Sequence, residues 1–492
     1  MSANSVTIPT SVGGLDTDSP PDEYPITHAT VFKNLLAKRS KIQVRPGYVD
    51  TEDAFILTSG GNNKIACLPL STGNKIYALT RSGVHDTSTT VAYSAASSVH
   101  MWQTCIFNKN LFFVRFEAGV ATGAFRDNGG TWSATGYTGA TIHQLCPHRG
   151  RMYAIGDNSG INLYYGGVNA ITGALTLFDA ASMLNRGGFL IGAISLSRQT
   201  PAGDKSQLAI ISSEGEVLIY DGDYPGAADW VLVRRVEIPK PSTVHYPGGD
   251  AIFDSWCNVG GDAWIMTARG PVSLERALQG DKPVIETKVA DEIAALWRQG
   301  PLGTDGSVDS IMYYKTENCI IINIATEDSV NGWNIPNYIQ YVIFLSTGVV
   351  CKWEGIPAAW FAEVGSFLYF IGRRGDLSIY KAWLGTTDDG AAIAWEYGSP
   401  WTQLGTPNNK KVSAIKPVIK SAAADSLTTK LDADLVESNN GYTSTLVANT
   451  YQQGWIPVIG SGKRFRVRLS GSTSVATELG SIEALVSQGS SK

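Results

Sequence analysis

The feature of this sequence that most constrains its fold is a recurring pair of short strand-like segments joined by a turn rich in Gly, Asn and Asp. Residues 208–220, 367–380 and 152–165 each contain one such pair. β-Branched and aromatic side chains fill the segments, and the turn residues tolerate the positive φ that a tight hairpin requires. The pattern therefore predicts a series of β-hairpins. Further hairpins of this kind are expected near 54–80, 104–125, 251–275 and 320–352.

The spacing of these hairpins indicates how they pack. They recur about every 40–50 residues, which is typical of repeat architectures. A single hairpin cannot bury its own faces, so neighbouring units must stack, and we expect a β-propeller of about six to eight irregular blades. An array of β-sandwiches would give the same local pattern and stays an alternative. A charged content of 17%, against roughly 25% in a typical soluble domain, and 52 Gly also favour a mainly β chain.

The pattern changes along the chain, which suggests three parts. Residues 1–50 are rich in Pro, Ser and Thr, and we expect an irregular segment that packs with the C-terminal part. Residues 51–395 carry the hairpins and are predicted to form the propeller. Residues 396–492 show longer alternating segments and are predicted to form a smaller β-rich domain. Within the hairpin region, apolar residues at helical spacing predict one packed helix over 289–297.

Charge and cysteine content limit the classes of protein. The net charge of −5 argues against tight, sequence-independent binding of nucleic acid. The six cysteines are spread without close pairs, as expected for small buried side chains in a reducing compartment. The N-terminus lacks the basic and apolar regions of a secretory signal, and no apolar run approaches the ~20 residues of a membrane span. We therefore expect a protein made in the cytoplasm with no membrane span.

Two basic stretches provide the candidate interaction residues. On a strand over 464–469, the arginines share one face and the apolar residues share the other. This face is either an ordinary solvated one, or a stripe that pairs with acids of a neighbouring subunit or touches DNA phosphates. We favour the subunit contact because the chain as a whole is acidic. The candidates are Lys38, Arg39, Lys41 and Arg45 in the first stretch and Lys463, Arg464, Arg466 and Arg468 in the second.

A motif that begins at Asp127 resembles the Asp box of sialidase-like propellers, with Gly129, Thr131 and Trp132 at the matching places. In such a turn the Asp bonds backbone groups, the Gly adopts positive φ and the Trp packs beneath. The motif is therefore predicted to be a structural hairpin. Phe125 replaces the usual Ser, and no motif indicates the arginine cluster, Tyr–Glu pair and general acid of a sialidase. A sialidase-like glycosidase is thus a minor alternative.

Other candidates for chemistry are weaker. His143, Cys146 and His148 lie close together in the sequence, so a metal site is conceivable. Alternate residues of a strand face opposite sides, and no fourth ligand has a typical spacing, so we expect ordinary strand and turn residues. No nucleophile elbow, P-loop or dinucleotide motif is present in the sequence. We predict no enzyme activity, no catalytic residue, no metal and no cofactor.

Several short pieces of the sequence, taken in order, carry a resemblance to a known family. The N-terminal pieces are 13–20, 24–29, 32–34 and 44–48, and the later ones are 162–165, 173–179, 186–190, 211–217, 220–225, 228–230, 232–233 and 270–278. Together they resemble the nozzle proteins of bacteriophage tails, also called tail tubular protein B-like or packaged-DNA stabilisation proteins. The resemblance covers a little over half of the chain. It departs from the family pattern where Asp16 replaces an Asn, where Leu35 follows Asn34, and where Pro46 fills a variable position.

This resemblance implies a structural protein of the virion tail of a short-tailed, podovirus-type phage. The family forms a homohexameric tube below the portal and adaptor proteins, and each subunit carries a β-propeller and a platform-like β-domain. The tube retains packaged double-stranded DNA, conducts it at ejection without sequence-specific binding, and offers docking surfaces for tail fibres or spikes. We expect its lumen to be acidic, so that DNA slides. The family has no catalytic residues. A propeller-based glycan- or receptor-binding tail module is the alternative.

Overall fold

The computed structural model is mainly β, as predicted, with two short α-helices among the described residues. None of these helices has the length and apolar content needed to cross a membrane. The structure describes residues 4–21, 23–38, 41–51, 64–71, 73–80, 82–86, 91–94, 99–117, 120–128, 132–156, 162–200, 203–242, 244–246, 249–251, 255–280, 289–297, 309–326, 329–330, 333–334, 337–372, 378–451 and 453–488.

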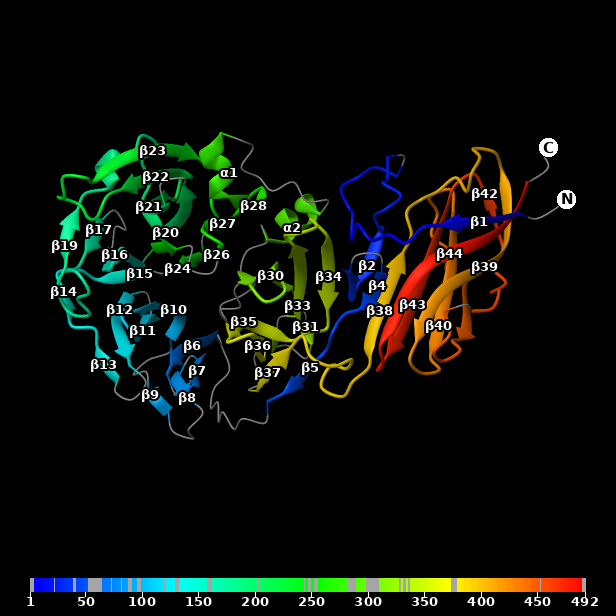
Figure 1. The fold of residues 1–492 in the computed structure, drawn as a ribbon, viewed down its shortest axis with the longest axis horizontal. Coiled ribbons are helices and arrows are strands. Elements are labelled where there is room, and N and C mark those ends of the chain that lie inside the picture. The colour runs from blue at the N-terminus through cyan, green and yellow to red at the C-terminus, as the bar shows by residue number, and fades with distance from the viewer. Residues whose placement is uncertain are drawn as a thin grey trace.

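A series of small antiparallel sheets occupies the left half of Figure 1. The first four sheets, in chain order, have four strands each. They are β6 (Lys64–Leu70), β7 (Gly73–Thr80), β8 (Gly83–Asp86) and β9 (Val91–Ser94); β10 (Val99–Phe107), β11 (Asn110–Glu117), β12 (Val120–Asp127) and β13 (Trp132–Ala134); β15 (Ile142–His148), β16 (Arg151–Gly156), β17 (Asn162–Tyr165) and β19 (Thr176–Phe178); and β20 (Leu190–Thr200), β21 (Gly203–Ser212), β22 (Glu216–Asp221) and β23 (Val231–Glu237).

Three further sets of strands follow. One set belongs to a larger sheet, and another gains a strand from the N-terminal segment. They are β26 (Trp256–Val259), β27 (Asp262–Thr267) and β28 (Gly270–Ser273); β29 (Ser310–Tyr314), β30 (Cys319–Thr326), β33 (Asn337–Phe344) and β34 (Val350–Glu354); and β35 (Ala358–Val364), β36 (Phe367–Gly372) and β37 (Ile379–Ala382) with β5 (Tyr48–Asp50). Small pairs are β14 (Tyr137–Thr138) with β18 (Gly173–Ala174), β24 (Val244–Tyr246) with β25 (Gly249–Ala251), and β31 (Ser329–Val330) with β32 (Trp333–Asn334); a short 3-10 helix covers Ala181–Met183.

Each of these sheets contacts the next one along the chain, and the last returns to the first. The contacts run from β6 to β10, β15, β20, β27, then from β26 to β29, β35 and back to β6. Buried apolar side chains fill the spaces between sheets; Ile65 and Ala78 of the first sheet pack with Ile371 and Ile379 of the last. The predicted hairpins at 152–165, 208–220 and 367–380 are confirmed as strand pairs. The propeller and its blade count stay predictions.

Two helices lie beside these sheets. The predicted helix is confirmed as α2 (Ala290–Trp297), whose buried face includes Ile293 and Trp297. A second helix, α1 (Leu274–Gln279), was not predicted from the sequence. The Ser273 side chain accepts a hydrogen bond at its start, and Gly280 ends it in the left-handed conformation. Its six residues are too few to show a clear helical period in the sequence.

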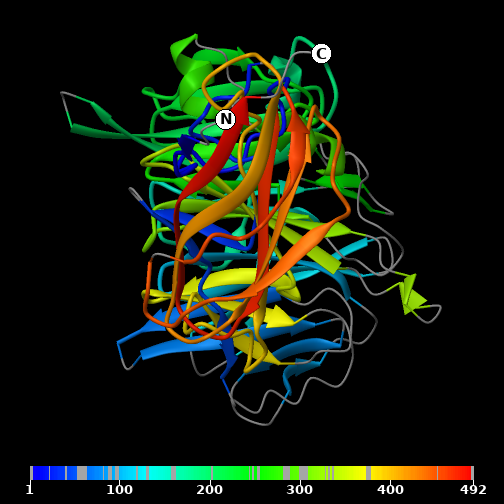
Figure 2. The same cartoon turned by 90° about the vertical axis from the view of Figure 1, so that its right-hand side faces the viewer.

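The C-terminal residues form two packed sheets, the platform domain (Figure 2). Together with N-terminal strands they bury a common core that includes Ile8, Ile42, Ile415, Phe465 and Ile482. One layer contains β38 (Ile393–Gly398), β43 (Phe465–Thr473), β40 (Ser426–Ala433) and β41 (Gly441–Thr445); the other contains β3 (Leu35–Lys38), β4 (Lys41–Val44), β44 (Thr477–Gln488), β39 (Lys410–Ser421), β42 (Gly460–Gly462) and β1 (Asn4–Ile8).

The N-terminal segment is not irregular, contrary to the sequence prediction. It supplies β1 to β5, and all of these except β3 pair with strands hundreds of residues away, which local composition cannot reveal. β2 (Val31–Lys33) lies between the two halves of the molecule: it pairs in parallel with β34 and antiparallel with β38. One nine-stranded sheet therefore runs in the order β29-β30-β33-β34-β2-β38-β43-β40-β41, from the series of small sheets into the platform domain. β38 spans the expected boundary at 395.

Candidate functional site

The first candidate site is the junction at which the N-terminal segment joins the two halves. The Leu15 amide donates a hydrogen bond of 2.8 Å to the Val350 carbonyl of β34. Gly14, with φ of 82°, has no room for a side chain, because a Cβ there would lie 2.5 Å from that carbonyl. A Cβ on Gly47 would lie only 1.8 Å from the Thr387 carbonyl. The close backbone approach therefore requires glycine at both positions.

Arg45 lies in the middle of this junction and is buried. Its guanidinium donates to both Asp388 carboxylate oxygens, at 2.8 and 2.6 Å, and to Asn34 Oδ1 at 3.0 Å. It also donates to the main-chain carbonyls of Pro46 and Glu354, at 3.1 and 3.4 Å. Such a bidentate, desolvated pair fixes geometry strongly. The prediction that Arg45 faces a partner or DNA is wrong, because its charge is used inside the chain.

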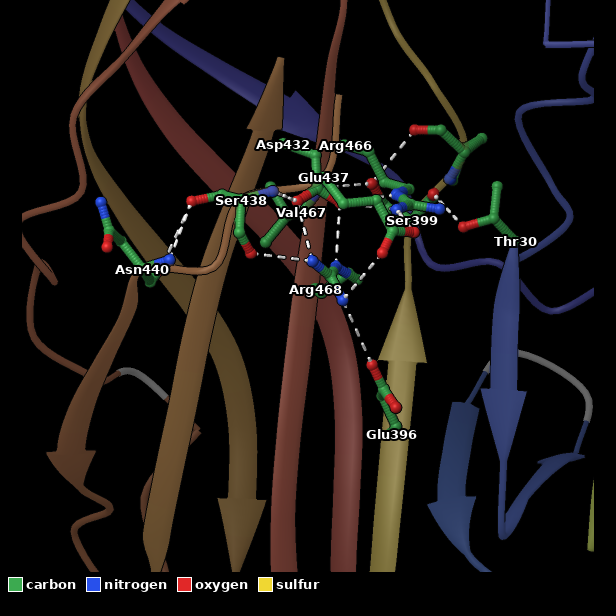
Figure 3. Close-up of polar contacts among 11 residues, drawn as sticks. Thr30, Glu396, Ser399, Asp432, Glu437, Ser438, Asn440, Arg466, Val467 and Arg468 are labelled. Carbon is green, nitrogen blue, oxygen red and sulfur yellow. Dashed lines mark hydrogen bonds and ion pairs between the residues drawn. The ribbon is translucent and has the colours of Figure 1, made fainter. Parts of the chain in front are cut away.

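The second candidate site is the arginine stripe of β43, drawn in Figure 3. Asp432 of β40 is buried and accepts from Arg466 Nε at 2.8 Å and from Arg468 Nε at 2.9 Å. Arg466 also bonds Glu437 at 2.5 Å, and Arg468 Nη1 lies 3.9 Å from Glu396. Burial opposes ionisation of Asp432, but hydrogen bonds from Arg468, a backbone amide and Arg466 hold its pKa below the usual range.

This network excludes both interpretations of the stripe, the solvated face and the basic surface that faces a partner. The predicted alternation is confirmed, since Phe465, Val467 and Leu469 are buried in the core on the opposite face. The Arg466 and Arg468 side chains are only 8% and 13% exposed. The acids expected on a neighbouring subunit are instead on the same chain. The stripe is thus neither a solvated face nor a free basic surface, and the partner-facing prediction is wrong for these two arginines.

The other described basic candidates are more exposed than Arg45, although Lys38 and Lys41 also have acidic partners within the chain, Glu317 at 3.8 Å and Glu478 at 3.1 Å. Lys38 and Lys41 lie on the β3–β4 hairpin with exposed side chains. Lys463 is exposed and Arg464 is half-buried, and both lie immediately before β43. Arg39 lies outside the described residues. A role of these residues toward a subunit or DNA stays a prediction.

A third candidate site was missed in the sequence. The outer face of the six-stranded sheet carries a set of lysines, two glutamates and two exposed rings, which we name the lysine–aromatic face. The cross-strand pairs Lys416–Glu483 and Lys420–Glu478 place these side chains on one side of β39 and β44. The only signal in the sequence was a spacing of lysines between buried apolar residues of β39. The face consists of Lys41, Lys411, Lys416, Lys420, Tyr451, Trp455, Glu478 and Glu483.

The side chains of this face contact one another. The Tyr451 hydroxyl donates to Glu478 at 2.5 Å and accepts from the Lys41 ammonium at 3.3 Å. The Lys420 ammonium lies 5.2 Å from the Tyr451 ring centre, and that of Lys416 lies 5.9 Å from the Trp455 ring centre. The Tyr451 hydroxyl and Lys41 hold the pKa of Glu478 below its usual range. The carboxylate is therefore ionised at neutral pH.

The Asp-box-like hairpin forms where the motif predicted it. Asp127, the last residue of β12, lies directly opposite Trp132, the first of β13. Gly129 and Thr131 lie outside the described residues. Asp127 is buried and accepts a hydrogen bond from the Tyr77 hydroxyl of the preceding sheet, while the Trp132 ring packs 5.9 Å from that tyrosine ring. These contacts connect two neighbouring sheets, which is consistent with a structural role for the motif.

The histidine and cysteine cluster of β15 does not form a ligand set. His148 Nδ1 lies 2.9 Å from the Ser195 hydroxyl. Burial, followed by the nearby Arg149 charge, lowers the pKa of His148 to about 4. Burial raises the pKa of Cys146 to about 12, so the thiol is protonated. Within the described parts of the chain, His, Cys, Asp and Glu side chains nowhere gather in a group of three that could hold a metal ion.

Comparison with known proteins gives only distant structural similarities. No known family and no curated protein sequence matches the chain. An exo-β-1,3-galactanase from Phanerochaete chrysosporium is similar at 8% identity and a TM-score of 0.26, over 78% of this chain and 95% of the galactanase. The SapL1 lectin is similar at 11% identity and a TM-score of 0.30, over 58% of this chain and 93% of the lectin. At such TM-scores neither similarity bears on function.

Proposed function

We propose that the chain is a structural protein of a short-tailed phage virion, the nozzle of the tail tube. The observation that carries this proposal is the position of the N-terminal pieces that resemble nozzle proteins. These pieces contain Gly14 and Gly47, where a close backbone approach requires glycine, and Arg45, which forms a buried ion pair at the junction. The resemblance thus falls in part on residues that build the junction between the two halves, which supports the proposal.

We further infer that the series of sheets forms a propeller of seven blades. The four sheets from β6 to β23, the three strands β26–β28, the strands β29–β34 and the sheet of β35–β37 make up this number. The contact between β35 and β6 supports closure of the ring. The pairing of β5 with β37 supports it as well, because the last blade is then completed by the strand that directly precedes the propeller sequence.

The proposed nozzle is a homohexamer that meets the portal–adaptor proteins on one side and offers surfaces to tail fibres or spikes. A ring with cyclic symmetry needs two different complementary faces on each subunit. A propeller and a platform domain connected by one nine-stranded sheet make a stiff wedge that is able to supply them. In this proposal double-stranded DNA passes through the lumen without sequence-specific contacts, the protein is not an enzyme, and its place is the virion tail.

Electron microscopy of the purified chain, alone and mixed with the portal–adaptor complex of its phage, tests the proposal. Six-fold rings with a channel wide enough for a DNA duplex are expected in the mixture. The same images at higher resolution count the blades. A chain that stays monomeric and shows no affinity for that complex would refute the nozzle.

A glycan- or receptor-binding tail module is the second candidate. The observation that favours it is the exposure of large aromatic rings, two of which, Tyr451 and Trp455, belong to the lysine–aromatic face. No described residue favours a sialidase-like glycosidase. A binding module predicts affinity for sugars without ring assembly.

A further inference from the structure

We propose that the lysine–aromatic face of the platform domain binds carbohydrate, with a preference for sugars that carry carboxylate or phosphate groups. The proposal goes beyond the tail tube, because the face is complete within one chain. It therefore holds whether or not the chain assembles into a ring.

The two aromatic rings of the face are exposed. Tyr451 is 39% and Trp455 is 44% exposed, and both come from the loop between β41 and β42. Large aromatic residues are mostly buried in a folded domain, so two exposed rings carried four residues apart by one loop favour a binding surface. A pyranose offers an apolar face of C–H groups that fits against such a ring.

The loop that carries the rings is held firmly in place. Gln453, which lies between the two rings in sequence, is buried. Its amide donates to the Ile419 carbonyl of β39 at 2.9 Å, and its Oε1 accepts from the Val447 amide at 3.0 Å. The backbone of Ile456 exchanges two hydrogen bonds with Ile415, at 2.7 and 2.9 Å. The rings are therefore presented on a preorganised support, which lowers the entropy lost on binding.

The charged groups around the rings suit a ligand rich in hydroxyl groups. The face has lysine ammonium groups that donate hydrogen bonds and glutamate carboxylates that accept them. Each carboxylate already pairs with a lysine, Glu478 with Lys41 at 3.1 Å and Glu483 with Lys416 at 3.6 Å. Lys411 and Lys420 then leave an excess of positive charge in a chain whose net charge is −5. This excess favours an acidic sugar over a neutral one.

Other occupants fit less well. A DNA duplex has its base faces stacked inside, so the exposed rings would find no base face to pack against. Single-stranded DNA needs a basic groove that follows several phosphates, whereas on this face only Lys411 and Lys420 are in excess of the two carboxylates. A second copy of the chain is disfavoured because lysine is depleted in the cores of protein interfaces. The mixture of rings, ammonium groups and carboxylates is best satisfied by a carbohydrate.

Titration calorimetry with the full chain tests the proposal, with tetragalacturonate as the acidic probe and maltotetraose as the neutral one. We expect both sugars to bind and the acidic one to bind more tightly. Trp455→Ala should weaken both about three- to tenfold, as for loss of one aromatic contact. Lys420→Ala should remove most of the preference for the acidic sugar. Because both side chains are partly exposed, these variants should fold normally, and thermal denaturation checks this.

A matched control is available on the propeller. Phe367 is 48% exposed, and the Lys381 ammonium lies 3.3 Å from its ring centre. The double variant Phe367→Ala/Lys381→Ala should leave sugar binding unchanged. The proposal is overturned if neither sugar binds up to about 10 mM, if Trp455→Ala binds like the wild type, or if oligothymidine binds more tightly than tetragalacturonate. A change of self-association in Trp455→Ala without a change in sugar binding would assign the face to a second copy instead.

Discussion

Replacement of Arg45 by alanine tests the junction between the two halves of the molecule. The substitution removes a bidentate pair with Asp388, whose bonds are 2.8 and 2.6 Å long, and a 3.0 Å bond to Asn34. Asp388 is 13% exposed and would keep its negative charge without a partner. Removal of one partner from a buried ion pair costs about 3–5 kcal/mol. We expect the free energy of unfolding of Arg45→Ala to fall by this amount.

The loss is measured by urea unfolding followed by tryptophan fluorescence and circular dichroism, so that both signals report on the same transition. Lys41→Ala is the control, because its ion pair with Glu478 is exposed and should contribute little to stability. The double variant Arg45→Met/Asp388→Leu should recover much of the loss, since it leaves no unpaired charge. If Arg45→Ala is no less stable than Lys41→Ala, the buried ion pair of Arg45 and Asp388 does not stabilise the junction.

Three further predictions concern single side chains. Gly47→Ala should lower the free energy of unfolding by about 3 kcal/mol or more because its Cβ would meet a carbonyl, whereas Gly454→Ala, with no atom within 4 Å of its Cβ, should change it little in the same urea assay. Asp432→Asn should cost about 3 kcal/mol, read as a lower thermal midpoint, because two arginines lose their carboxylate; an unchanged midpoint would contradict this. His148 has a pKa of about 4 when folded against 6.5 for a free imidazole, so the stability that it contributes is complete above pH 6.5 and is lost as the pH falls toward 4. His148→Gln should therefore flatten the pH dependence of unfolding over this range, and an unaltered slope would refute the assignment.

Local features were predictable from the sequence because their signals are local. The hairpin at 208–220 is encoded by two β-rich segments around a short turn, and its partners are only a few residues apart. The helix at 290–297 follows from apolar spacing within two turns. The alternation over 464–469 likewise determines which side of β43 is buried. None of these requires knowledge of a distant segment.

The functional candidates depended on distant segments and were therefore harder to predict. In the sequence, Arg45 belongs to a basic stretch, but its ion-pair partner Asp388 lies 343 positions away along the chain. The arginines of β43 likewise pair with Asp432 of the neighbouring strand β40, which their own segment of the sequence does not reveal. The lysine–aromatic face requires β4, β39, β44 and the loop of Tyr451 to come together, and no sequence period records that arrangement.

The place of β2 has a practical consequence for dividing the chain into fragments. This strand has only three residues, yet it fills the gap between β34 and β38 in the nine-stranded sheet. A fragment that starts at residue 51 would lose both β2 and β5, and it would leave β34 as an open edge ready to pair with other molecules. A fragment that starts at 396 would lack β1 to β4 and half of β38. An expressed chain should therefore keep residues 4–488 together, because neither half carries all the strands of its own sheets.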